Sequence, residues 1–143
     1  MESNEKQIRT VLQTWAKATS EDRKEDILSS HTEEAVFFDV LPPMRYDGKE
    51  AYRKSWDEWQ PSFEIPSLFG IEDLQIFCGA DHAFCHGFIR CGGKLTDGEI
   101  VEDLVRATFC LVRDQSGWRI VHQHISMPLQ LNEGVEQGSG GNG

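Results

Sequence analysis

Residues 106–128 read RATFCLVRDQSGWRIVHQHISMP, which is two strand patterns joined by the polar turn DQSG. Side chains alternate between the two faces of a strand, so His122 and His124 leave the same face. If the turn is short, Arg106 and Thr108 lie opposite the histidines on that face, whereas one residue of slip would separate them. A strand pair that is apolar on one side and polar on the other predicts a cavity with a polar floor.

The composition indicates a single domain that binds neither nucleic acid nor membranes. The chain has 143 residues, enough for a hydrophobic core, and its 24 acidic and 14 basic residues give a net charge of −10. This sign disfavours nucleic acid and anionic lipid as partners. No apolar run is long enough to span a bilayer, and the start MESNEKQ has no signal-peptide pattern, so we expect a cytoplasmic protein.

Four cysteines are spread through strand-like segments, and no two of them form a C-x-x-C pair. They are Cys78, Cys85, Cys91 and Cys110. Buried reduced thiols are the expected state, with disulfides or a zinc site as the alternative.

Helical and strand patterns follow one another along the chain. Apolar spacing predicts helices over residues 5–19, 20–30 (with Ser20 as N-cap) and 48–59, and a strand over 35–40. Four longer strands are predicted over residues 62–78, 81–91, 99–113 and 118–126, with a bulge or bend at Pro66 or Gly70. The Gly-rich residues 132–143 are expected to be a disordered tail after a domain of residues 1–131.

This order of elements predicts an α+β fold. Short connections between long strands imply an antiparallel meander, and the three preceding helices would close one face of it. A strongly curved sheet closed in this way forms a cone with a central pocket. The outer face of the sheet would remain apolar, which indicates a homodimer packed sheet to sheet.

The same order, ending in GWRIVHQHIS, resembles the SnoaL-like and ketosteroid-isomerase-like proteins of the nuclear transport factor 2-like superfamily, which has a cystatin-like fold. The closing hairpin is also similar to the association domain of calcium/calmodulin-dependent protein kinase. The resemblance implies a cone-shaped α+β domain, usually dimeric, with a small-molecule cavity. Such families include isomerases, cyclases, dehydratases and non-catalytic assembly modules, so the fold leaves the activity open.

Asp39 is the first candidate for catalysis. It lies among apolar residues, where desolvation raises the pKa of a carboxylate and makes it a better base. In ketosteroid isomerase the general base is an aspartate at the end of this strand, and Asp39 matches it. The resemblance places Trp15 where that enzyme has an oxyanion-hole tyrosine, and Thr108 near its second acid, so both isomerase donors are missing. The alternative for Asp39 is a strand-end carboxylate that accepts backbone N–H groups.

Arg90 and Arg106 form a second candidate group. The motifs F-I-R and V-R-A-T-F match the pocket arginines of the association domain, and two inward arginines would bind a carboxylate ligand. The alternative is a surface position, or a buried ion pair with Glu102, Asp103 or Asp39.

The histidines complete the candidate site. His124 is expected near the cavity as an acid or base, and His122 as a ligand contact or a hydrogen-bonding residue that fixes local structure. An H-x-H pair can bind a metal, but a third ligand is needed and none is evident, so we predict no metal. The faces of His82 and His86 are left undecided.

No phosphate-binding loop, dinucleotide fingerprint or nucleophile elbow is present, so we expect no cofactor. The sequence predicts a small-molecule-binding protein. One hypothesis is acid/base catalysis of the isomerase, cyclase or dehydratase type on an apolar carbonyl or carboxylate compound. The alternatives are a non-catalytic binding domain and an oligomerisation module.

Overall fold

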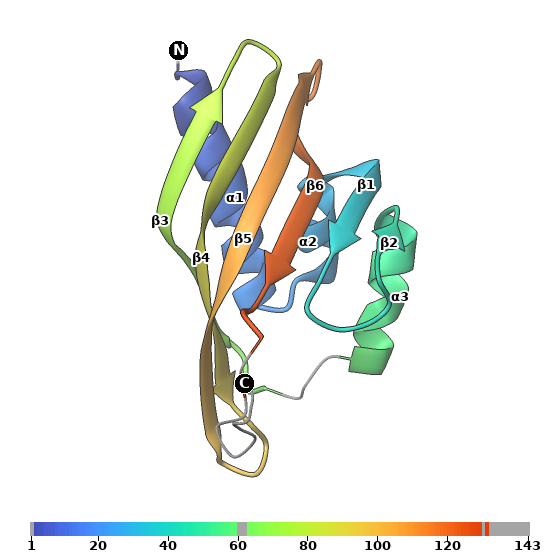
Figure 1. Cartoon of the computed structure of the whole chain (residues 1–143), viewed down its shortest axis with the longest axis vertical. Helices are drawn as coiled ribbons and strands as arrows, with labels where there is room; N and C mark the ends of the chain where they lie inside the picture. The colour runs from blue at the N-terminus through green and yellow to red at the C-terminus, as the bar shows by residue number, and fades with distance from the viewer. Residues whose placement is uncertain (1, 60–62, 130, 132–143) are drawn as a thin grey trace.

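The computed structural model describes residues 2–59, 63–129 and 131. Three helices and six strands appear in the predicted order (Figure 1). The helices are α1 (Asn4–Ser20), α2 (Lys24–Ser29) and α3 (Lys49–Trp59). The strands are β1 (His31–Phe38), β2 (Tyr46–Asp47), β3 (Leu68–Cys78), β4 (His82–Lys94), β5 (Ile100–Asp114) and β6 (Gly117–Ser126). The predicted α+β class is confirmed.

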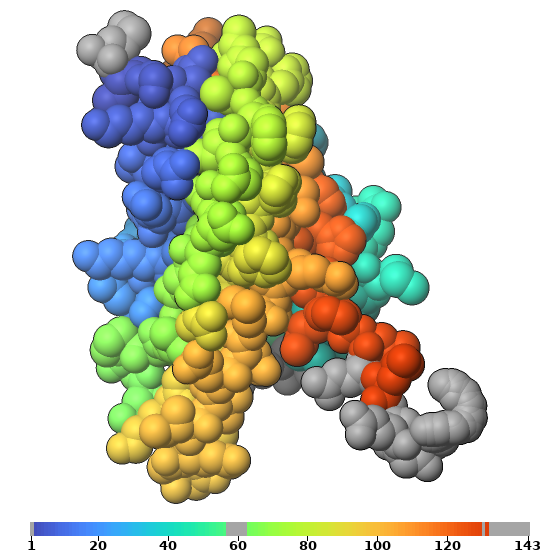
Figure 2. Space-filling model, turned by 60° about the vertical axis from the view of Figure 1, so that its left-hand side comes forward, coloured from blue at the N-terminus to red at the C-terminus, as the bar shows by residue number. Residues whose placement is uncertain are grey.

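The strands form one sheet in the order β2-β1-β6-β5-β4-β3. The predicted antiparallel meander is present in β3 to β6. β1 instead pairs in parallel with β6, so the sheet is mixed. Because of this pairing the end of β1 lies beside the second half of β6, and Phe38 is the register partner of His124. The hairpin of β4 and β5 extends beyond the rest of the sheet (Figures 1 and 2).

α1 forms because its apolar residues share one face and its start is capped. The Ser3 hydroxyl accepts a hydrogen bond from the Lys6 N–H at 3.2 Å. Ile8, Leu12 and Trp15 are buried, and the helix lies along β3 (Figure 2). Burying side chains of this size contributes about 1.5–3 kcal/mol each.

The second helix is shorter than predicted. Ser20 does not cap it but is the last residue of α1, and its hydroxyl donates to the Ser67 carbonyl. The chain then turns at Asp22, whose φ of 56° lies in the left-handed region, and α2 begins at Lys24. The cap was misplaced because Ser20 bonds to a residue 47 positions away, which no local pattern reveals.

β3 also begins later than predicted, at Leu68 rather than at residue 62. The predicted bend at Pro66 is present just before the strand, but the register shift lies between Glu72 and Gln75 and not at Gly70. The opposing residue explains the position, because a Cβ atom at Gly87 would lie 2.9 Å from the Glu72 carbonyl oxygen. Because Gly87 has no side chain, the irregular backbone of β3 can approach it closely at this point.

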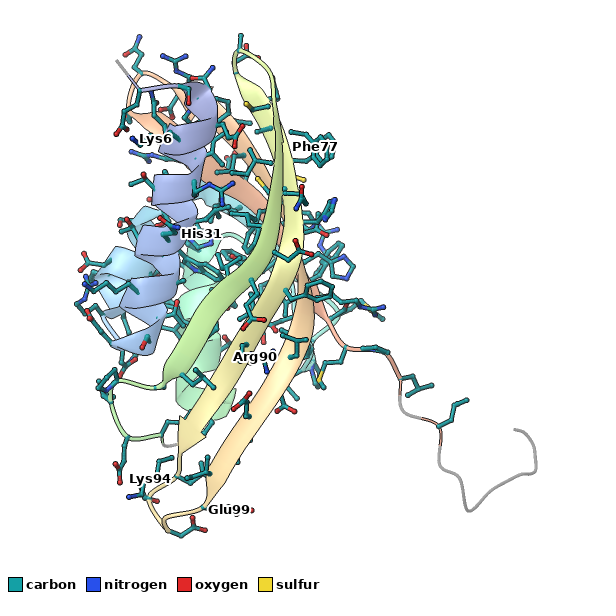
Figure 3. All side chains as sticks on the ribbon, turned by 90° about the vertical axis from the view of Figure 1, so that its left-hand side faces the viewer. Lys6, His31, Phe77, Arg90, Lys94 and Glu99 are labelled. Atoms are coloured by element: carbon teal, nitrogen blue, oxygen red, sulfur yellow. The ribbon has the colours of Figure 1, made fainter. Side chains whose placement is uncertain are left out.

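The helices cover only one face of the sheet, which we call the inner face (Figures 1 and 3). Along β4 and β5 buried residues alternate with exposed ones, and the buried set faces the helices. It comprises Ala83, Cys85, Ile89, Val105, Ala107, Phe109 and Leu111. The residues between them form the outer face, which no helix covers. In Figure 3 Phe77 projects from the outer face, whereas His31 lies on the helix side.

The closing hairpin has the short turn that the sequence predicted. Asp114 and Gly117 are register partners, and the φ of 108° at Gly117 suits glycine. Thr108 is the direct partner of His124, so the prediction that these polar residues share a face is confirmed. A bulge at Val121 adds one residue to β6.

In the described part of the chain, no helix has the length and apolar character needed to cross a bilayer. The predicted disordered tail, residues 132–143, lies outside the described residues and stays a prediction.

Candidate ligand-binding pocket

A pocket of about 440 Å³ lies between the helices and the inner face of the sheet. This volume is in the range of small-molecule sites, which lie at roughly 300–1,000 Å³. Most of its lining is apolar or aromatic. The ring-bearing side chains come from three parts of the chain, namely Trp15 in α1, Tyr52 and Trp56 in α3, and Phe63 and Phe69 around the start of β3.

Asp39 lines this pocket directly after the last residue of β1. Its Oδ1 accepts the N–H of Val40 at 2.7 Å, and its Oδ2 accepts the hydroxyl of Tyr52 at 3.4 Å. Burial raises the pKa of Asp39, and the two hydrogen bonds partly offset this rise. Asp39 therefore combines the two alternatives considered for it, because it is a desolvated carboxylate and also accepts a backbone N–H.

Tyr52 holds Asp39 from α3. Its ring stacks on that of Phe37 with centroids 4.1 Å apart and an interplanar angle of 7°. Burial, and then the negative charge of Asp39, raise the pKa of the Tyr52 hydroxyl well above its usual value. The hydroxyl therefore stays protonated at neutral pH and acts as the donor to Asp39.

Asp103 also lines the pocket, although the sequence suggested it only as a partner for an arginine. It lies on β5 in register with Cys91. The pKa of the Cys91 thiol is raised by burial and then by the negative charges of Asp103 and Asp39. A usable signal was present in the sequence, because Asp103 alternates in step with the apolar residues Val105 and Phe109.

Trp15 also lies in the pocket wall. Its side chain is only 2% exposed and makes edge contacts with Phe69 and Phe109, each at 5.3 Å between centroids. The indole Nε1 is buried without a hydrogen-bond partner among the described residues. An unpaired buried donor costs about 1–3 kcal/mol, and because this nitrogen has almost no accessible surface, an acceptor could reach it only after a rearrangement of the pocket wall.

The predicted anion site is not in this pocket. Arg90 lies on the outer face, where its guanidinium binds Glu72 and Glu102, each at 2.7 Å. The surface alternative, and not an inward arginine, describes Arg90, and its ion pair with Glu102 is exposed rather than buried. Arg106 is exposed on the same face, and its Nε donates to the Ser126 hydroxyl at 3.2 Å. The prediction that the arginines share a cavity with Asp39 was wrong, because they alternate with the buried residues of their strands.

Thr108, His122 and His124 are likewise outside the pocket. Nδ1 of His122 lies 2.7 Å from the Val36 carbonyl oxygen, which fits the local structural role considered for it. Phe38 makes edge contacts with both imidazole rings. Because of the bulge at Val121 both histidines face outward, while Ile120 and Gln123 on either side are buried. Ligand contact by these outer-face residues stays a prediction.

The structure also shows where the remaining histidines of interest and the four cysteines lie. His82 and His86 are exposed, and all four cysteines are free. Only Cys85 is fully buried, while Cys78 is exposed, so the expectation of buried thiols holds in part. The described residues contain no cluster of three or more metal-ligating side chains.

A second hollow of about 400 Å³ lies between α1 and β3. It is lined by charged residues of both signs, including Arg9, Lys17 and Asp73. Ligand sites combine an apolar wall with a few perturbed polar groups, so the pocket at Asp39 is the better candidate.

The chain belongs to the family of SnoaL-like domains, whose model matches residues 8–130. No curated protein matches the sequence. Among solved structures, an NTF2-like protein of unknown function from Pseudomonas putida KT2440 is similar, with 26% identity and a TM-score of 0.74 over 87% of this chain and 86% of that one.

Two further structures share the fold at lower identity. The association domain of C. elegans CaMKII has 18% identity and a TM-score of 0.69 over 86% of this chain and 95% of its own. A ketosteroid isomerase-like protein from Erwinia carotovora atroseptica SCRI1043 has 15% identity and a TM-score of 0.69 over 85% and 95%. The predicted resemblance to these groups is confirmed at the level of the fold.

Proposed function

We propose that this protein binds an apolar small molecule in the pocket and that Asp39 transfers a proton to or from the bound compound without a cofactor. The position of Asp39 carries this proposal, because its carboxylate is desolvated among aromatic rings and its pKa is raised. A base of raised pKa next to a ligand cavity is the arrangement that general acid/base catalysis needs.

The neighbours of Asp39 give each group a role. The hydroxyl of Tyr52 holds one carboxylate oxygen, which fixes the direction of the other. The indole ring of Trp15 would contribute apolar surface to the ligand site. The chemistry is that of an isomerase, cyclase or dehydratase acting next to a carbonyl group.

The test is a comparison of Asp39→Asn with the unchanged protein on a panel of apolar carbonyl, lactone and epoxide compounds. We expect turnover to fall at least about a hundredfold while binding is retained, because the amide keeps the shape but cannot accept the proton. Glu34→Gln, which neutralises an exposed carboxylate on β1, the strand that Asp39 follows, is the matched control. Equal turnover by both variants would refute a catalytic role, and binding without turnover in the unchanged protein would favour a binding protein.

The outer face of the sheet supports a second function, assembly into a homodimer. Phe77, Phe84 and Phe88 are 39–53% exposed there, and the first two rings stack at 4.9 Å. An exposed apolar patch on a sheet with one bare face is typical of a protein interface. Association domains share this fold, which agrees with such a role.

The charge distribution supports a second copy of the chain as the occupant of this face. Each copy of the molecule has a net charge of −10, so two copies repel each other in most orientations. Around the exposed aromatic rings, however, Arg90 and Arg106 balance the negative charges of Glu72 and Glu102. Sedimentation equilibrium should give twice the monomer mass, and a monomer at micromolar concentration would refute assembly.

A further inference from the structure

A histidine that the proposed chemistry does not use is buried where α2, β1 and β6 meet. His31 is the first residue of β1, and its exposed fraction is 0%. Its Nδ1 lies 3.1 Å from the carbonyl oxygen of Ile27 in α2, and its Nε2 lies 2.7 Å from Oε1 of Gln123 in β6. Gln123 is also buried. The imidazole ring therefore connects three elements through hydrogen bonds that are shielded from water.

The hydrogen bonds of His31 are compatible with both of its protonation states. A carbonyl oxygen only accepts, so the Nδ1 that faces Ile27 carries a proton in either state. At Nε2 the amide of Gln123 serves both, because its NH₂ group donates to a neutral nitrogen and its oxygen accepts from a protonated one. A half-turn of the amide exchanges the two arrangements. Hydrogen bonding alone therefore does not choose the charge of the ring, and the cost of burying that charge decides.

The surroundings of His31 disfavour the charged ring. Burial is the largest influence, and it lowers the pKa of His31 below that of an ordinary histidine although both hydrogen bonds oppose it. The positive charge of Lys49 in α3 lowers this pKa further. That ammonium group lies 3.3 Å from the Leu28 carbonyl oxygen, at the end of α2 beside the ring. The folded protein therefore holds a neutral His31 at neutral pH.

The acidic groups on the elements around this histidine are engaged elsewhere. In α2 and α3 the carboxylates of Glu25, Asp26 and Glu50 form exposed ion pairs with arginines. In β1 those of Glu33 and Glu34 are exposed. The ionisable residues of β6 lie on the outer face of the sheet, namely Arg119, His122 and His124. Among the described residues no carboxylate pairs with the ring, so a proton on it would be a buried charge without a counter-ion.

Two routes link the ring to the ligand pocket. The first runs through α2, because the carbonyl group that faces Nδ1 belongs to Ile27, whose side chain lines the pocket. The second runs through aromatic rings. His31 meets Phe37 at 4.9 Å between centroids, and Phe37 in turn stacks on Tyr52. The Tyr52 hydroxyl binds Asp39, so this route ends at the carboxylate of the pocket.

From these observations we propose that His31 is a pH-sensitive switch that controls the ligand pocket. At neutral pH the uncharged ring holds α2 and β1 against β6. In acid a proton on the ring loosens this junction, and with it the part of the pocket wall that Ile27 and Tyr52 form. The inference rests on the proposed function only in that the pocket it controls is the ligand site, and it does not require Asp39 to be catalytic.

The pH range follows from the proton that opening takes up. In the open junction His31 is an ordinary histidine with a pKa of about 6.5, whereas in the closed junction its pKa is lower. Below a pH of about 6.5 the open fraction should therefore rise about tenfold for each pH unit, until the pKa of the closed state is reached. Above this range the open fraction should not depend on the charge of His31.

Hydrogen exchange between pH 7.5 and pH 5 measures the opening. Peptides that cover residues 24–38, corrected for the intrinsic exchange rate, should lose protection about tenfold per pH unit below pH 6.5, whereas peptides from β5 should not. The measurement uses Asp39→Asn, so that titration of Asp39 does not contribute. In the same protein the indole NMR signal of Trp56, whose ring meets Tyr52 at 5.6 Å, should shift with the same midpoint.

Two further variants, each combined with Asp39→Asn, assign the effect to His31. His31→Gln should abolish the pH dependence, because an amide forms hydrogen bonds without taking up a proton. His86→Gln, at an exposed histidine of β4, is the matched control and should keep it.

Gln123→Glu, in the same Asp39→Asn background, should invert the dependence. A carboxylate next to the ring raises the pKa of His31 by about one to three units. Opening then releases a proton, so the junction should open less as the pH falls toward 6.5. If a variant fails to fold, exchange in the Asp39→Asn protein and the ¹⁵N titration of its His31 ring decide on their own.

Three results would overturn the switch. One is protection of residues 24–38 that stays constant between pH 7 and pH 5, or that still depends on pH in His31→Gln. Another is a ¹⁵N midpoint for His31 at or above 6.5 in the folded protein. The third is an opening junction that leaves the Trp56 signal unchanged, since this would separate it from the pocket. No ligand is used, so these failures leave the proposed function to the turnover assay, and absent turnover leaves the switch intact.

Discussion

Tyr52 and Asp39 are joined across the pocket wall by a hydrogen bond of 3.4 Å from the tyrosine hydroxyl to Oδ2 of the aspartate. One residue belongs to α3 and the other follows β1, so the bond couples the third helix to the edge of the sheet beside the pocket. The pKa of Asp39 is raised although this hydrogen bond acts to lower it. Burial is therefore the dominant influence on the carboxylate.

Loss of the Tyr52 hydroxyl should raise the pKa of Asp39 further. Tyr52→Phe removes a donor that favours the charged carboxylate but keeps the ring that stacks on Phe37. The ¹³C chemical shift of the Asp39 carboxyl group, followed by NMR as a function of pH, measures the change. Tyr46→Phe is the control, because the Tyr46 hydroxyl donates to the Pro42 carbonyl instead. A downward shift of the Asp39 pKa in Tyr52→Phe would contradict the assigned hydrogen bond.

Neutralising Asp39 should stabilise the protein at neutral pH. Its pKa in the folded state is raised above that in the unfolded chain, so the folded protein binds this proton more tightly. The contribution of Asp39 to stability therefore falls as pH rises from the unfolded pKa of about 3.9 through the raised folded value. Asp39→Asn avoids this loss, and its Tm at pH 7 should be a few degrees higher.

The gain in Asp39→Asn should vanish in acid, below the unfolded pKa, where the wild-type carboxyl group is protonated in both states. Scanning calorimetry between pH 3 and pH 7 follows this dependence. Glu34→Gln should show no such gain. A destabilised Asp39→Asn at neutral pH would mean that the charge is compensated within the fold.

Gly92 should tolerate no side chain. Its φ is 136°, and a Cβ atom there would lie 2.0 Å from the Val101 carbonyl oxygen on the neighbouring strand. Gly92→Ala should therefore lower the free energy of unfolding by about 3 kcal/mol or more, as strained backbone and steric overlap combine. Urea unfolding measures this. Gly70→Ala, where nothing lies within 4 Å of the new Cβ, should cost much less. Equal losses in both variants would contradict the close approach at Gly92.

A charge in the aromatic patch of the outer face should dissociate the proposed dimer. Phe84 is 53% exposed and stacks on Phe77, so Phe84→Lys would place two like charges in a face that packs on itself. We expect a monomer in sedimentation equilibrium at concentrations where the unchanged protein is dimeric. Met44→Lys, at a side chain 91% exposed in the loop before β2, should stay dimeric. If Phe84→Lys remains a dimer, the interface lies elsewhere.

Much of the fold could be predicted because it follows from local patterns. The spacing of Ile8, Leu12 and Trp15 defines α1, and the polar turn before Gly117 sets the register of the closing hairpin. The start of β3 and the cap of α2 were misplaced, because Ser20 and Ser67 bond to each other across the chain. Long-range bonds of this kind leave no trace in a local window.

The site was only partly predictable for a different reason. Alternation groups Arg106 with Thr108, and Asp103 with Val105, but it does not say which group faces the helices. A polar set of side chains was read as the floor of a cavity, although the apolar set is the one that α1 buries. Asp39 was found because it lies among apolar residues at the end of a strand, and Trp15 because the family resemblance places it at a pocket position.

The indole N–H of Trp15 reports most directly on whether the pocket is the ligand site. The four tryptophans give separate indole signals in a ¹H–¹⁵N NMR spectrum, and Trp15→Phe identifies the signal of Trp15. On titration with a compound of the carbonyl panel we predict a saturable shift of the Trp15 signal, because its ring lines the pocket, with little change at Trp118, which is buried away from the pocket. Saturating binding that leaves the Trp15 signal in place and instead shifts the outer-face residues around Phe84 and His124 would contradict a ligand site at Asp39.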